Sequence, residues 1–131
     1  MTEDNDWPEL RALYGTGPLP DPSTCTLFHV HIDERDTSVT FGFETQQLPQ
    51  HPKPEWSDKP YNTLAFWIEF TGVADLRMSG IRAEAERSVR IAGGNTAEGL
   101  RVAVDSDNRS IAFSATASLV SHTRVYQQGA L

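Results

Sequence analysis

Residues 63–70 constrain the fold of this chain most strongly, because their apolar side chains recur with the period of a β-strand. The other face of this strand includes Trp67, a large side chain that needs cover, so we expect the strand to lie inside a sheet. Trp67 is covered either by the protein's own N-terminal helix or by another molecule. The apolar face consists of Leu64, Phe66, Ile68 and Phe70.

The alternation of apolar and polar residues in the rest of the chain predicts a mainly β protein. A hairpin is expected over Thr26–Asp33 and the strand after it, with Phe28 among the inward-facing residues. A short strand around Leu76 and Met78 follows, and four later runs read as strands: 88–92, 100–104, 110–115 and 118–126. About eight short strands separated by turn residues favour an antiparallel β-sandwich or a flattened barrel.

The N-terminal region predicts one short helix, at about residues 7–14. Asp6 is the expected N-terminal cap, Pro8 fits the first turn, and Gly15 provides the stop. We expect residues 1–131 to form one domain, β-rich over 24–126. A proline-rich loop at about 45–62 is long enough to suggest a function. It carries Trp56 and Tyr61, which either cover the core or anchor a partner.

The charge distribution points to a type of partner. The formal net charge is −7. Residues 1–66 contain 11 acidic and 4 basic residues, whereas residues 67–131 contain 7 of each. Such a surface repels nucleic acid and attracts a basic protein. Most arginines of the second half are expected to pair with acids on neighbouring strands: Glu84, Glu86, Glu98 or Asp105.

Candidate catalytic and membrane features are weak. His29, His31 and Asp33 share one face of the first predicted strand, where two imidazoles at this spacing can share a metal, but a solvated outer face explains the same pattern. Cys25 is expected to be an inert, buried thiol. We expect no cofactor and no metal. The acidic start and the lack of a long apolar run favour the cytoplasm and no membrane contact.

The order of short landmarks resembles the immunity protein 50 family of bacterial polymorphic toxin systems. The landmarks are Trp-Pro-Glu-Leu, Leu-Phe-His-Val-His-Ile-Asp, Val-Thr-Phe-Gly-Phe, Pro-Glu-Trp56, Thr-Leu-Ala-Phe-Trp-Ile-Glu-Phe-Thr-Gly-Val, Asp75-Leu-Arg-Met-Ser-Gly80 and Ile111-Ala-Phe-Ser-Ala. The likeness extends through the closing strand to Tyr126. It implies a small cytoplasmic protein that binds and neutralises a cognate toxin, with no catalytic residues to carry over.

We therefore predict a non-enzymatic immunity protein whose partner is a toxin, with a basic toxin favoured by the charge. Homo-oligomerisation stays open. The alternatives are a small metal-dependent hydrolase using His29, His31 and Asp33, and a β-barrel carrier of a small apolar ligand with Trp67 lining its cavity. The predicted partner-binding residues, with Trp56 as the favoured aromatic anchor, are Asp33, Glu34, Asp36, Trp56, Asp58, Tyr61 and Trp67.

Overall fold

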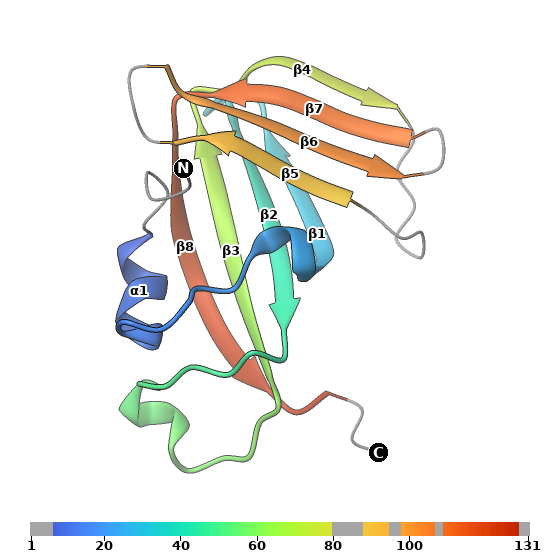
Figure 1. The fold of residues 1–131 in the computed structure, drawn as a ribbon. Helices are drawn as coiled ribbons and strands as arrows, with labels where there is room; N and C mark the ends of the chain where they lie inside the picture. The colour runs from blue at the N-terminus through green and yellow to red at the C-terminus, as the bar shows by residue number, and fades with distance from the viewer. Residues whose placement is uncertain (1–6, 80–87, 95–97, 107–108, 129–131) are drawn as a thin grey trace.

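The computed structural model describes residues 7–79, 88–94, 98–106 and 109–128 and is mainly β (Figure 1). Eight strands form two separate antiparallel sheets of four strands each, so the predicted fold class is confirmed in its sandwich form. The strands are β1 (Thr26–Asp33), β2 (Ser38–Thr45), β3 (Thr63–Thr71), β4 (Ala74–Ser79), β5 (Ser88–Gly93), β6 (Leu100–Ser106), β7 (Arg109–Ala115) and β8 (Ala117–Tyr126). The helical elements are α1 (Pro8–Tyr14) and two short 3-10 helices, η1 (Pro22–Thr24) and η2 (Pro54–Trp56).

Sheet A has the order β1-β2-β3-β8. As predicted, β3 is an inner strand, paired with β2 on one side and β8 on the other. Its four predicted apolar residues are inaccessible to solvent. Phe66 lies opposite Phe43 of β2, and their rings stack with centroids 5.5 Å apart. The period-two pattern therefore assigned both the position and the inner face of this strand correctly.

Sheet B has the order β4-β7-β6-β5 and crosses one half of sheet A (Figure 1). Aromatic rings join the two sheets, since Phe113 of β7 lies 5.9 Å from Phe41 and 5.4 Å from Phe70. The other half of sheet A lies under α1 and the connector that follows it (Figure 1). Leu10 and Leu13 of α1 belong to the same buried core. One apolar core thus lies between sheet A and two different covers.

The chain passes from one sheet to the other at two corners that touch. Gly72 leads from β3 to β4 with φ +63°, and a Cβ there would lie 2.3 Å from Thr116 Oγ1, in the β7–β8 corner. The backbone N–H of Thr116 donates to the carbonyl of Thr71 at 2.9 Å. Glycine is therefore required at position 72 for two reasons: the backbone is left-handed there, and a side chain would prevent the close contact with Thr116.

The helix α1 begins differently from the prediction. Trp7 occupies the N-cap position with φ 45°, and its buried indole N–H donates to Ser118 Oγ at 2.9 Å. The predicted cap, Asp6, lies outside the described residues. The helix ends as predicted at Gly15, whose N–H donates to the carbonyl of Arg11. Packing of the Trp7 indole against β8 fixes the entry of this helix.

The proline-rich loop between β2 and β3 lies against α1. His51 N–H donates to the carbonyl of Leu13 at 2.9 Å, and the Tyr14 hydroxyl donates to the carbonyl of Gln47. Trp56, in η2, is 6% exposed and belongs to the core. This loop therefore closes the lower end of the core in Figure 1.

One inward-facing assignment of the sequence analysis was wrong. Phe28 is 42% exposed, because β1 has a bulge between Leu27 and His29. A bulge inserts one residue and reverses the faces of the residues before it. Leu27 consequently takes the inward position and is buried, while Phe28 lies on the outer face of sheet A.

Candidate functional site

The outer face of sheet A, which points away from sheet B and α1, gathers aromatic, imidazole and apolar side chains. Two bulges produce this cluster. One brings Phe28 and His29 to the same side of β1, and the other leaves Ser121 as an extra residue in β8, with His122 opposite Trp67. We call this surface the aromatic face; it consists of Phe28, His29, His31, Trp67, Leu119 and His122.

Trp67 is the centre of the aromatic face. Cross-strand register aligns His29, Gly42, Trp67 and His122 in one row over four strands. The Trp67 ring contacts Phe28 edge-on at 5.5 Å and His122 at 5.0 Å. A Cβ on Gly42 would lie only 2.8 Å from Trp67 Nε1, so the indole lies directly over this glycine. The missing side chain at Gly42 is what lets Trp67 lie on the sheet.

The aromatic face is open to solvent in the part of the chain that the structure describes. Phe28 and Leu119 are each 42% exposed, and Trp67 is half-buried by its own neighbours. The N-terminal helix does not cover Trp67, because α1 lies against the opposite face of sheet A. Exposed apolar side chains gathered around a tryptophan are typical of a protein-binding surface.

Acidic residues border the aromatic face. Asp33 follows His31 on the outer side of β1 and begins the turn that carries Glu34 and Asp36. Glu69 of β3 pairs across the strands with Leu119 and so adds one carboxylate within the face rather than at its border. The surface therefore combines an apolar centre with an acidic rim, the arrangement in which the centre supplies affinity and the rim supplies steering.

The paired histidines do not complete a metal site among the described residues. The rings of His29 and His31 lie parallel, with centroids 6.4 Å apart. Asp33 Oδ1 accepts hydrogen bonds from the backbone N–H groups of Arg35 and Asp36, at 3.0 and 3.2 Å, and so shapes the turn. No group of three or more His, Cys, Asp and Glu side chains that could hold a metal occurs in the described ranges. The hydrolase alternative finds no third ligand there.

The predicted partner-binding residues fall at two ends of sheet A. Asp33, Glu34 and Asp36 lie at the β1–β2 turn, beside the aromatic face. Asp58 and Tyr61 lie in the loop between β2 and β3, at the far end of the same strands. A strand of eight residues spans about 26 Å, so the two acidic groups are separated by roughly the width of one standard interface patch. Trp67 lies midway along β3, between the two groups.

The burial of Trp56 favours the first of its two predicted roles, the cover of the core, over the aromatic anchor. Its ring packs edge-on against Tyr61 at 6.4 Å, and Lys53 Nζ lies 5.4 Å from the ring centre. A side chain that is 6% exposed reaches a partner only if the loop opens. Trp56 is thus the cover of the core that the sequence allowed as an alternative, and Trp67 is the more accessible tryptophan.

The carrier alternative placed Trp67 in the lining of an internal cavity. In the structure Trp67 lies on the outer face, while the space between the sheets is filled by packed rings such as Phe41, Phe70 and Phe113. The position of Trp67 therefore does not favour the carrier.

Two groups outside the aromatic face, the buried Tyr14 and the half-buried Cys25, have raised pKa values. Burial raises the pKa of the Cys25 thiol to about 11, and its Sγ donates to the carbonyl of Asp21 at 3.3 Å. Burial also raises the pKa of the Tyr14 phenol well above its ordinary value. Both shifts favour the neutral form of the group and so lower its nucleophilicity at physiological pH.

A model of the immunity protein 50 family matches residues 9–126. The chain belongs to this family. The match runs from α1 to the last residue of β8, and it confirms the family resemblance expected from the sequence. No curated protein and no solved structure gives a significant match to the chain. In the described ranges, none of the helices of this immunity protein 50 family member has the length and apolarity needed to cross a membrane.

Sequence reasoning missed several residues of the aromatic face of this family member. Phe28 was placed inward, and Leu119, Gly42 and His122 were not considered as site residues. The two bulges are the reason, because a one-residue insertion changes which side chains share a face and leaves no clear mark in the apolar pattern. The one available signal was Gly42, a glycine inside a strand, which often marks close approach by another group.

Proposed function

We propose that this protein is an immunity protein that binds a cognate bacterial toxin with the aromatic face of sheet A and thereby neutralises it. Membership of the immunity protein 50 family supports a toxin as the partner. The observation that carries the choice of surface is the exposed cluster of Phe28 and Leu119 around Trp67. Binding, not catalysis, is the proposed mode of action, and the bacterial cytoplasm is its proposed place.

The energetics of protein recognition support this surface. A few central aromatic residues usually supply most of the affinity, and tryptophan is prominent among them. Trp67 is already positioned by Phe28, His122 and the sheet below it, so little side-chain entropy is lost when a partner covers it. An antiparallel sheet is also a rigid platform, which keeps the face largely preformed.

The acidic rim supports a basic toxin. Asp33, Glu34 and Asp36 lie at the end of β1, next to His31, on a protein with a net charge of −7. Charges at an interface rim accelerate the encounter of opposite partners and act less on the lifetime of the complex. In this proposal the turn steers the toxin and the aromatic face holds it.

A binding and growth-rescue experiment tests the proposal. The toxin domain encoded beside the gene of this protein is produced in bacteria with the wild-type protein, with Leu119→Ala, or with Leu76→Ala. These two leucines form a matched pair, being 42% and 37% exposed, but Leu76 lies in β4 of sheet B. We expect Leu119→Ala, especially combined with Trp67→Ala, to weaken toxin binding by at least tenfold and to reduce protection.

The control Leu76→Ala should bind and protect as the wild-type protein does. Failure of the wild-type protein to bind this toxin, or to protect cells from it, would refute the proposed function. Equal binding by all variants would refute the choice of surface while leaving the function in place.

A further inference from the structure

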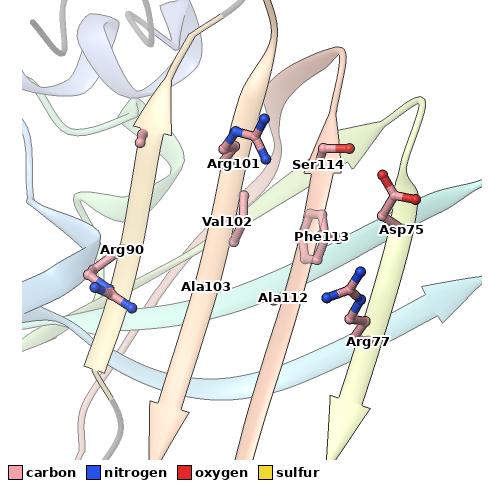
Figure 2. A pocket seen from close by; sticks show the side chains of 10 residues that line it. Asp75, Arg77, Arg90, Arg101, Val102, Ala103, Ala112, Phe113 and Ser114 are labelled. Atoms are coloured by element: carbon pink, nitrogen blue, oxygen red, sulfur yellow. The ribbon is translucent and has the colours of Figure 1, made fainter.

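The outer face of sheet B carries a second surface of opposite charge, separate from the aromatic face. Three arginines, Arg77, Arg90 and Arg101, line an open pocket of about 430 Å³ on this face (Figure 2). Among the described residues, Asp75 is the only acidic one that lines it. We call this the arginine pocket. It is a local positive site on a protein whose net charge is −7.

Strand register explains how the pocket forms. Arg77, Ala112, Ala103 and Arg90 lie in one row across β4, β7, β6 and β5. The two central residues are alanines, whose side chains are short. The row therefore has a depression in its middle and a long, charged arginine side chain at each end. Arg101 belongs to the neighbouring row. Figure 2 shows the guanidinium groups of Arg101 and Arg77 pointing toward β7 from its two sides.

The charges of the pocket are only partly compensated. Arg90 pairs with Asp105, one of the acids expected to pair with these arginines, at 2.8 Å, but both side chains are exposed, and such pairs contribute little. Arg77 and Arg101 form no ion pair with any residue that the structure describes. Two of their expected partners, Glu84 and Glu86, lie outside the described ranges. The pocket therefore offers guanidinium donors to an external anion.

The backbone of β4 is shaped to the pocket at Asp75. The register with β7 shifts between Ala74 and Arg77, and Asp75 has φ 57°, an uncommon value for a residue with a side chain. The resulting bulge places the Asp75 carboxylate at the edge of the pocket (Figure 2). A carboxylate here repels a continuous polyanion, yet it can accept a hydrogen bond from a peptide N–H.

We propose that the arginine pocket binds an acidic, extended peptide segment of a partner protein, with carboxylates at alternate positions. The two outer arginines lie on strands three steps apart, which is roughly 14 Å. Carboxylates at positions i and i+4 of an extended peptide are separated by about the same distance, with the intervening one near Arg101. Three arginines accompanied by a carboxylate are few cations for a nucleic acid, whose affinity depends on the neutralisation of many phosphates.

An NMR titration tests this proposal without knowledge of the partner. The ¹⁵N-labelled protein is titrated with a peptide of alternating Thr and Glu, and in parallel with the same peptide carrying Lys for Glu, with inorganic phosphate and with oligothymidylate. We expect the Glu peptide to shift amide signals of β6 and β7 in a saturable manner. The double variant Arg77→Gln/Arg101→Gln should weaken this binding at least tenfold.

The matched control is Arg35→Gln/Lys59→Gln, which removes the same charge from exposed positions elsewhere and should bind the peptide nearly as the wild type does. Ala112→Glu places a carboxylate in the middle of the arginine pocket and should also abolish peptide binding. This variant tests the pocket without removing an arginine. The proposal is overturned by absence of peptide binding, by equal loss in the control, or by phosphate or oligothymidylate binding more tightly than the peptide.

Discussion

Replacing Phe66 by alanine is the sharpest test of the core. Phe66 is inaccessible to solvent, lies at the centre of β3, and stacks on Phe43. Removal of a buried phenylalanine ring costs about 3–5 kcal/mol, because transfer free energy is lost and a cavity remains. A domain of this size has only about 5–15 kcal/mol of total stability, so the variant should be close to its folding limit.

The expected change in melting temperature follows from the size of the chain. For 131 residues, an unfolding entropy of about 0.28 kcal/mol/K means that each kcal/mol lowers Tm by roughly 4 °C. Phe66→Ala should thus lower Tm by about 11–18 °C in thermal unfolding followed by circular dichroism. Phe66→Leu, which keeps most of the volume, should lose much less. Ser121→Ala, an exposed change in β8, should alter Tm by no more than about 2 °C. A Phe66→Ala shift as small as that of Ser121→Ala would refute the assignment of the inner face.

Three further outcomes are expected. Gly42→Ala should displace the Trp67 indole, since the new Cβ would lie 2.8 Å from Nε1. We expect a changed tryptophan fluorescence spectrum and weaker toxin binding. An unchanged spectrum and affinity would contradict the packing of Trp67 on Gly42. Because the pKa of Cys25 is raised to about 11, the thiolate is scarce at pH 8, and alkylation by iodoacetamide should be on the order of a hundred times slower than that of an exposed thiol. A rate equal to that of free cysteine would disprove this. Replacing Glu34 and Asp36 by lysine should slow toxin association and weaken its dependence on salt, with the dissociation rate nearly unchanged. Faster dissociation with an unchanged association rate would show that these residues lie at the centre of the interface and not at its rim.

Much of the fold was predictable because alternation of apolar residues directly reports which face of a strand is buried. The succession of strands along the chain, the inner position of β3, its buried face and the stop of α1 at Gly15 all follow from local sequence. Each of these features depends on neighbouring residues and on side-chain period.

The candidate site was less predictable because it depends on long-range register. Phe28 and His122 reach the aromatic face only through bulges, and the sequence shows no sign of the extra residue. The sequence leaves Trp56 open between covering the core and anchoring a partner, since loop aromatics do both, and only tertiary packing places it in the core. The arginine pocket likewise requires β4 and β5, which follow each other along the chain, to lie at opposite edges of sheet B.

Side-chain footprinting of the toxin complex tests the central claim most directly. Hydroxyl radicals oxidise exposed Phe, Leu and Met side chains, so the free and toxin-bound proteins can be compared residue by residue. We predict that Phe28 and Leu119 become protected on binding, while Leu76 and Met78, which are also exposed but lie on β4, react as in the free protein. Protection of Leu76 and Met78 with unchanged reaction at Phe28 and Leu119 would contradict the assignment of the aromatic face as the toxin-binding surface.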